Sequence, residues 1–129
     1  MGKRLLMIEH RGRRSGKLYR TVIEVAGRHR DKGEWIVTAG FGPKSDWYLN
    51  LQAGTLEAVW IGSRCHTANV RFLEPIEAGD VMGAYEQAHP RTARNLLDLM
   101  GVSYDGTDEG RVEMMRQIPM VAFRLDEFV

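Results

Sequence analysis

The stretch that decides the fold is residues 19–39, which read Tyr-Arg-Thr-Val-Ile-Glu-Val-Ala-Gly-Arg-His-Arg-Asp-Lys-Gly-Glu-Trp-Ile-Val-Thr-Ala. Its two ends, 19–26 and 34–39, are rich in β-branched and aromatic residues, which is typical of strands. The polar segment 27–33 begins and ends with glycine and predicts a turn. We therefore expect an antiparallel pair of strands within a meander.

Further segments extend this pattern to about six strands. Strands are also expected at residues 5–10, 55–61, 65–73 and 118–125. Helices are expected from Ser45 or Asp46 to Gly54, from Pro75 to a break at Pro90, from Ala93 to Gly101, and for a turn or two over 112–117, after an acidic loop at 104–110. Strands that come in runs favour an α+β fold with an antiparallel sheet or barrel over a doubly wound parallel sheet.

Length and composition fit one ordinary globular domain over residues 1–129. The chain is 43% hydrophobic and 27% charged, close to the average for such domains. It has no apolar run near 18 residues, so stable membrane insertion is not expected, and its N-terminal apolar stretch is too short for a secretory signal. The single cysteine, Cys65, excludes an internal disulfide and fits a reducing, cytoplasmic setting.

The net charge of +1 hides a strong asymmetry along the chain. Residues 1–30 hold nine Lys or Arg and two Asp or Glu, a local charge of +7, whereas residues 31–129 carry −6. A basic segment of this kind indicates an anionic partner, which could be a phosphate, a nucleic acid or a membrane surface.

Several kinds of site find no support in the sequence. The four histidines lack the spacing of a helical metal site, so no metal is expected. Ser15 and Ser45 do not lie in the turn of a serine hydrolase. The Gly40-Phe41-Gly42 segment lacks the third glycine of a dinucleotide fingerprint.

Two segments indicate chemistry. The first runs from Gly12 to Lys17 and is followed by Arg20-Thr21, which places cations and hydroxyls around a glycine turn where backbone N–H groups can approach a phosphate. A solvated basic hairpin or a nucleic-acid patch would have the same composition.

The second segment runs from Gly40 to Leu51 and leads from a glycine loop into a short helix. The start of a helix favours an anion, and Phe41 and Trp47 could flank a flat ring. A capped core helix with Trp47 and Leu51 buried is the alternative.

Taken together, these segments resemble the deazaflavin-dependent nitroreductase family, whose members bind coenzyme F-420 in a split β-barrel. The matching motifs are the turn Gly12–Lys17 with Arg20-Thr21, the helix start Asp46-Trp47-Tyr48-Leu49-Asn50-Leu51, and the last strand, Ile118 to Arg124. Val22 stands where the family commonly has proline. The resemblance implies an α+β split β-barrel and an F-420-dependent oxidoreductase that passes a hydride to a small organic acceptor, such as a nitro compound or a quinone.

The resemblance also implies the residues that bind the cofactor. Its phosphate and glutamate tail would lie on the basic turn, and its ring along the second strand and the glycine loop. The full set is Arg13, Arg14, Ser15, Gly16, Lys17, Arg20, Thr21, Val22, Ile23, Thr38, Ala39, Gly40, Phe41, Trp47 and Asn50. We expect Met100 and Tyr104 to contact the substrate.

The sequence leaves other functions open. The chain could be an FMN-binding split-barrel oxidoreductase, a non-catalytic module that binds F-420, or a nucleic-acid-binding protein, which is the least expected of the three. Because split-barrel proteins often dimerise over the sheet, a homodimer is the default expectation.

Overall fold

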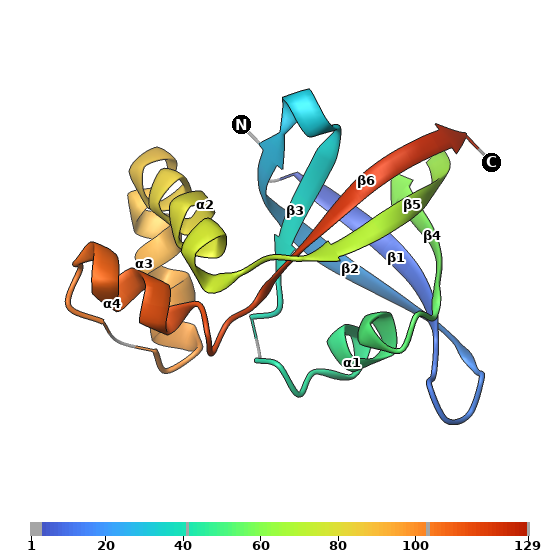
Figure 1. The fold of residues 1–129 in the computed structure, drawn as a ribbon, viewed down its shortest axis with the longest axis horizontal. Helices are drawn as coiled ribbons and strands as arrows, with labels where there is room; N and C mark the ends of the chain where they lie inside the picture. Colours follow the sequence, from blue (N-terminus) through green and yellow to red (C-terminus); the bar gives the residue numbers. More distant parts are fainter. Residues whose placement is uncertain (1–3, 41, 103, 129) are drawn as a thin grey trace.

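A computed structural model describes residues 4–40, 42–102 and 104–128, which form a barrel flanked by helices (Figure 1). In order, the elements are β1 (Leu5–Arg11), β2 (Leu18–His29), a 3-10 turn (Arg30–Lys32), β3 (Glu34–Thr38), α1 (Asp46–Gln52), β4 (Leu56–Ile61), β5 (Arg64–Phe72), α2 (Pro75–Ala88), α3 (Pro90–Leu99), α4 (Asp108–Met114) and β6 (Met120–Phe128). The strands close in the order β1-β2-β3-β6-β5-β4, and each neighbouring pair is antiparallel. The expected α+β barrel of six strands is confirmed.

The barrel closes around a core that the alternation of β1 already indicates. Leu6, Ile8 and His10 point inward and are buried, because successive residues of a strand face opposite sides of the sheet. Opposite them, Val37 on β3 and Phe123 on β6 are fully buried. These contacts hold β1 and β2, which carry the basic turn, in a rigid frame.

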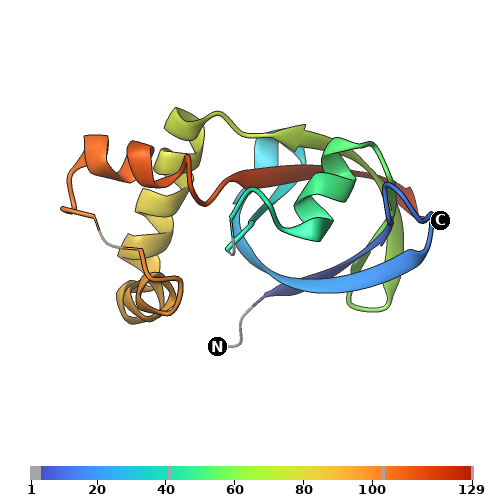
Figure 2. The ribbon, with the colours of Figure 1, turned by 90° about the horizontal axis from the view of Figure 1, so that it is seen from below.

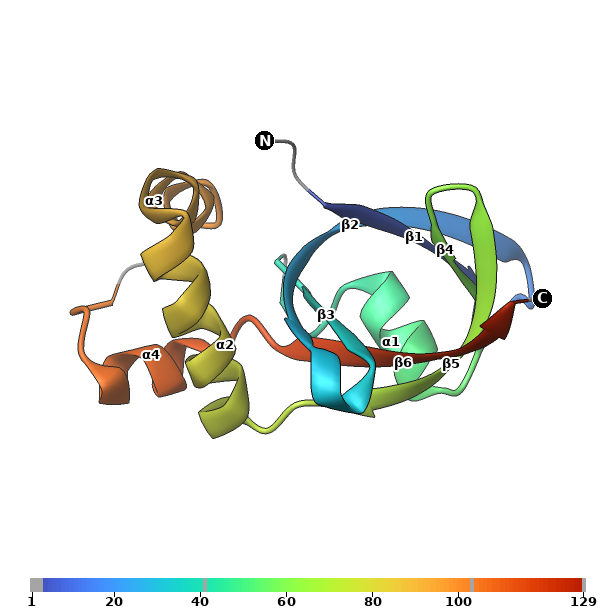
Figure 3. The same cartoon turned by 90° about the horizontal axis from the view of Figure 1, so that it is seen from above.

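The helices occupy two different places. Helix α1 lies across one end of the barrel, as the views along the barrel show (Figures 2 and 3). Helices α2, α3 and α4 stand together at one side and enclose a second hydrophobic core that includes Met82, Leu97, Met115 and Ile118. Part of the second strand, β2, therefore faces the helices α2 and α3 across a narrow space.

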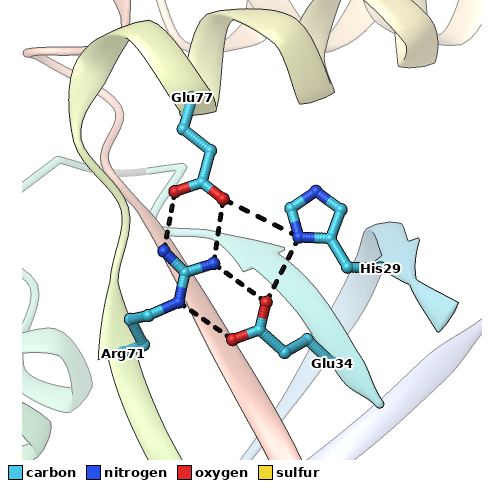
Figure 4. A network of polar contacts seen from close by, with 4 residues as sticks. All are labelled: His29, Glu34, Arg71 and Glu77. Carbon is cyan, nitrogen blue, oxygen red and sulfur yellow. Dashed lines mark hydrogen bonds and ion pairs between the residues drawn. The ribbon is translucent and has the colours of Figure 1, made fainter. Parts of the chain in front are cut away.

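An ion-pair network joins α2 to the barrel (Figure 4). The Arg71 guanidinium on β5 donates to both carboxylate oxygens of Glu34 on β3, at 2.8 and 2.9 Å, and to both of Glu77 on α2, at 2.7 and 2.8 Å. His29 Nδ1, at the end of β2, lies 3.2 Å from Glu34 and 3.7 Å from Glu77. We call these four residues the α2 clamp, because they fix the helix that forms one wall of the cavity described below.

Some element boundaries differ from the sequence prediction. The expected turn at 27–33 is shorter, because β2 continues through a bulge near Gly27 to His29 and pairs with β3 as far as Glu34. The turn is then made by the 3-10 residues and by Gly33, whose φ of +66° favours glycine. The third predicted helix begins at Pro90 rather than Ala93, since proline is well tolerated in a first helical turn.

The C-terminal part differs in a similar way. The predicted loop 104–110 already contains the start of α4, because the Thr107 hydroxyl accepts a hydrogen bond from the Gly110 N–H at 3.0 Å and caps the helix. The helix ends at Met114 rather than Gln117. The last strand begins at Met120, two residues later than predicted, because Ile118 packs into the helical core.

Candidate functional site

Two neighbouring hollows beside β2 share lining residues, and we call the two together the groove. One is a polar trough of about 480 Å³ along the turn between β1 and β2, and the other is an apolar cavity of about 340 Å³ between β2 and the helices. Thr21 and Trp47 line both hollows and mark their junction. The groove therefore has a basic end and an apolar end, and both volumes lie in the range of small-molecule sites.

The basic turn between β1 and β2 is a compact backbone structure. The Gly12 N–H donates to the Lys17 carbonyl at 2.8 Å, and the Gly16 N–H donates to the Gly12 carbonyl at 2.9 Å. Gly16 has a φ of +72°, a conformation that side chains disfavour, so glycine is required there. A Cβ at Gly12 would lie 2.5 Å from Ser15 Oγ, so a larger residue there would require the Ser15 side chain to move.

The cations of the trough have different partners. The Arg13 guanidinium donates to Asn50 Oδ1 at 2.9 Å and lies 3.4 Å from the exposed carboxylate of Asp46. Arg20 pairs with Glu9 at 3.1 Å. The exposed Arg14 side chain, which lines the trough, makes no hydrogen bond or ion pair within the described part of the chain. Arg14 is thus the arginine of the turn that can meet an anion without giving up an existing contact.

Helix α1 presents Trp47 to the groove and buries the next positions. Trp47 is half-buried and meets the ring of Tyr48 edge-on at 6.1 Å, and Tyr48 in turn packs edge-on against Phe72 at 5.5 Å. Tyr48, Asn50 and Leu51 are buried. The helix has only seven residues, and its first turn carries Asp46, so the positive charge for an anion comes from the basic turn rather than from the start of α1.

The apolar cavity has one wall on the barrel and one on the helices. Thr21 to Glu24, Ala26, Thr38 and Gly40 form the barrel side. Met82 and Tyr85 of α2 and Leu96 of α3 form the helical side. Val22 contributes an apolar side chain that is 62% exposed.

A hydrogen-bonded pair joins the two walls of this cavity. The Tyr85 hydroxyl donates to Glu24 Oε2 at 2.9 Å, which joins α2 to β2. Burial first, and then the neighbouring carboxylate, raise the pKa of Tyr85 to about 12, so the hydroxyl stays protonated near neutral pH. A proton is therefore held beside the apolar end of the groove.

The structure brings most of the predicted residues to the groove. The residues that line the two hollows are Gly12 to Ser15 of the basic turn, Arg20 to Ile23, Thr38, Gly40, Trp47 and Asn50. Gly16 and Lys17 belong to the same turn but do not line either hollow. Ala39 is fully buried in the barrel core. Met100 lies beside the cavity rim, because a Cβ at Gly40 would be 3.2 Å from its sulfur. Phe41 lies outside the described residues.

Tyr104 is not brought to the groove. Its hydroxyl donates to Glu86, and it lines a different hollow formed by α3 and the loop after it. The structure therefore offers no contact between Tyr104 and a ligand in the groove.

Sequence reasoning missed the helical wall and one buried residue. Met82, Tyr85 and Leu96 show helical spacing, but spacing alone does not tell which neighbour a helix face covers. His10 lines the trough with 3% exposure and could have been found, because it continues the inward alternation of Leu6 and Ile8. Within the described residues, no group of three metal-binding side chains is arranged to hold an ion.

The sequence profile of the F420H2-dependent quinone reductases matches residues 1–96, which include the basic turn, β2, α1 and all of α2. The chain belongs to this family. The expected relation to F-420-dependent split-barrel enzymes is thereby confirmed, and the family's cofactor is coenzyme F-420. No curated protein sequence matches the chain.

Solved structures support the fold. An F420-H2 dependent reductase (FDR-A) aligns with a TM-score of 0.59 at 22% identity, over 92% of each chain. A protein described as a domain-swapped dimer aligns with a TM-score of 0.59 at 20% identity, over 95% of this chain and 81% of that one. The chain is an F-420-dependent oxidoreductase by family, with the split-barrel fold. No helix within the described residues is long and apolar enough to cross a membrane.

Proposed function

We propose that this protein binds F-420 along the groove and reduces a small electron-poor compound, a quinone or a nitro compound, at the apolar end. The observation that carries the proposal is the junction of a basic trough and an apolar cavity at Thr21 and Trp47. F-420 has the same division, since a flat ring is joined to an anionic phosphate and glutamate tail. The residues present therefore fit the cofactor.

The basic turn would hold the anionic part of the cofactor. Arg14 offers an unengaged guanidinium, and Ser15 offers a hydroxyl that already accepts from the Lys17 N–H at 3.2 Å. Charge-assisted hydrogen bonds of this kind are about twice as strong as neutral ones. Lys17 adds an exposed ammonium on the same turn.

The apolar cavity would hold the ring and the acceptor. When bound, F-420 supplies a hydride from one ring carbon, so the protein mainly has to orient the ring and the acceptor and to exclude water. Val22 and Ile23 offer one apolar surface, and Met82 and Leu96 offer the other. The two apolar walls favour a flat, uncharged acceptor over a charged one.

Reduction of a quinone to a hydroquinone consumes a proton as well as a hydride. Tyr85 is the hydroxyl of the helical wall that stays protonated near neutral pH, and its hydrogen bond to Glu24 at 2.9 Å holds it in place, while a proton that it gives away is replaced from the solvent. We assign the pair to the acceptor side of the site, where it would hold a proton beside the reacting oxygen.

The test is a titration of the purified protein with F-420 and with FMN, followed by assays with a panel of quinones and nitro compounds. We expect tight F-420 binding, weaker FMN binding and turnover of at least one quinone. Tight binding without turnover would support a non-catalytic F-420 module. Preference for FMN would support a flavin enzyme, and retention on DNA without F-420 binding would support a nucleic-acid-binding protein.

We also propose a homodimer that works in the cytoplasm. The proposal is supported by the structural neighbour described as a domain-swapped dimer and by the exposed side chain of Leu5 on β1. The single Cys65 fits a reducing compartment. Light scattering after gel filtration would give the molar mass, and a monomer would contradict the dimer.

A further inference from the structure

A buried histidine connects the trough to the junction of the groove. His10, 3% exposed, lies between two polar side chains: its Nδ1 is 3.0 Å from Asn50 Nδ2, and its Nε2 is 2.9 Å from Thr21 Oγ1. The ring of Tyr19, which also lines the trough, stacks on the imidazole with the ring centres 5.9 Å apart. Asn50 in turn contacts Arg13, so a chain of hydrogen bonds runs from the basic turn to Thr21.

The orientation of the Asn50 amide is fixed by two donors. The Arg13 backbone N–H, at 3.1 Å, and the Arg13 guanidinium, at 2.9 Å, both point at the same Asn50 atom. Both groups can only donate, so the atom that receives them must be the carbonyl oxygen. The Asn50 NH2 group therefore faces His10 and donates to its Nδ1.

This donation fixes the tautomer of His10. Since Nδ1 accepts a hydrogen bond, it carries no proton. Burial lowers the pKa of His10 below its usual value, which favours the neutral ring near pH 7. A neutral imidazole has one N–H, so the proton is on Nε2 and is donated to Thr21 Oγ1.

The direction of the Thr21 hydroxyl follows. Its oxygen already accepts from His10, and it makes no other side-chain hydrogen bond among residues 4–40, 42–102 and 104–128. Thr21 is partly exposed and lines both hollows. The hydroxyl proton is therefore available to a ligand at the junction.

We propose that His10 is a positioning residue that makes Thr21 a hydrogen-bond donor toward the cofactor ring, and so selects a ring edge that presents an acceptor such as a carbonyl oxygen. The inference rests on the proposed function, because it assumes that the ring lies at the junction. It goes beyond that function because it assigns a donor and an acceptor to each hydrogen bond that links Arg13, Asn50, His10 and Thr21. One amide thus orients both the arginine of the tail end and the hydroxyl of the ring end.

The first experiment reads the tautomer in the ligand-free protein. A long-range proton–nitrogen NMR spectrum of uniformly labelled protein at pH 7 separates protonated from unprotonated ring nitrogens, and His10 is assigned by loss of its signals in His10→Phe or by backbone connectivity. We expect an unprotonated Nδ1 and a protonated Nε2. The opposite tautomer or a doubly protonated ring would overturn the inference, whether or not F-420 binds.

The second experiment is a double-mutant cycle on F-420 affinity. Thr21→Val should weaken binding roughly tenfold, because it removes the donor of one hydrogen bond to the cofactor ring. Thr21→Ser keeps that donor and should retain affinity within about twofold. His10→Phe should weaken binding in the wild-type background and add nothing in the Thr21→Val background. Additive losses, or equal affinity of the Val and Ser variants, would overturn the inference.

The controls separate this inference from the proposed function. Thr67→Val makes the same change on the exposed side of β5, away from both hollows, and should leave the affinity unchanged. If His10→Phe fails to fold, the inference is still tested by the NMR spectrum of the wild type and by the comparison of Thr21→Val with Thr21→Ser. Wild-type protein that binds neither F-420 nor FMN refutes the proposed function. Wild-type binding that Thr21→Val does not weaken refutes the inference alone.

Discussion

Arg71→Met should destabilise the protein by about 2 kcal/mol at pH 7. The substitution keeps an unbranched apolar stem and removes the guanidinium that makes four hydrogen bonds of 2.7 to 2.9 Å to Glu34 and Glu77. The Glu34 side chain, only 7% exposed, would then be left with His29 as its remaining partner in the α2 clamp.

The magnitude follows from the charge of Glu34. Hydrogen bonds from Arg71 first, opposed by burial and aided by His29, hold the pKa of Glu34 at about 2. Against a usual value near 4.3, at about 1.4 kcal/mol per tenfold change, this difference corresponds to roughly 3 kcal/mol. Since the Arg71 side chain is 40% exposed, water screens part of the interaction, and we expect about two-thirds of that figure.

The pH dependence gives the sharper test. The folded pKa of Glu34 lies below its unfolded value, so the carboxylate stabilises the fold fully above about pH 5 and loses this contribution as the pH falls toward 2. The difference in unfolding free energy between wild type and Arg71→Met should therefore shrink between pH 7 and pH 3.

The assay is urea unfolding followed by fluorescence at both pH values. The matched control is Arg116→Met, which removes an exposed pair with Glu113 at 3.1 Å and should change stability by less than about 0.5 kcal/mol. The reasoning would be refuted if Arg71→Met lowered the unfolding free energy at pH 7 by no more than the control does. It would also be refuted if the loss relative to wild type were the same at pH 7 and pH 3.

Three further variants test the groove. Arg14→Ala should weaken F-420 binding by roughly 1.5–3 kcal/mol and leave the melting temperature unchanged. Arg13→Ala should lower both the affinity and the melting temperature, because Arg13 also bonds to Asn50. Isothermal titration and thermal melts check this, and equal melting temperatures of the two variants would contradict it. Trp47→Phe should keep the fold to within about 1.5 kcal/mol but weaken F-420 binding and reduce the fluorescence quenching that F-420 causes; an unchanged response would place Trp47 outside the site. Tyr85→Phe should leave F-420 affinity within about twofold and slow quinone turnover roughly 10- to 100-fold; unchanged turnover would leave Tyr85 a structural role only.

The sequence predicted the barrel well because β-branched and aromatic residues mark most of its strands and glycine turns separate several of them. Residues 34–39 and 55–61 differ from β3 and β4 by one residue at a single end. The errors occur where tertiary contacts decide. Strand β2 passes through the polar residues after Gly27 because β3 offers backbone partners there, and no local pattern contains that information.

The basic end of the groove was predictable because local sequence patterns mark it. The basic turn and Trp47 lie in two short segments whose residue types reveal their chemistry. The helical wall was not predictable, because Tyr85 meets Glu24 across 61 positions of sequence. Tyr104 shows the converse, since this loop aromatic was expected at the substrate, but it bonds to Glu86 of α2 and lines a different hollow.

Arg13 and Arg14 show what a sequence motif leaves open. They are adjacent and carry the same side chain, and the resemblance assigns both to the phosphate. In the structure, Arg13 uses its backbone N–H and its guanidinium to fix Asn50, and through it His10, whereas the Arg14 guanidinium lines the trough without a partner among the described residues. An anion that drew the Arg13 guanidinium away from Asn50 would remove one of the two donors that orient the amide. The backbone N–H would remain, because it belongs to the turn itself. The side chains of the turn can therefore bind an anion while the Arg13 backbone N–H still holds the Asn50 amide. The direction of the hydrogen bonds from Asn50 to Thr21 is then unchanged.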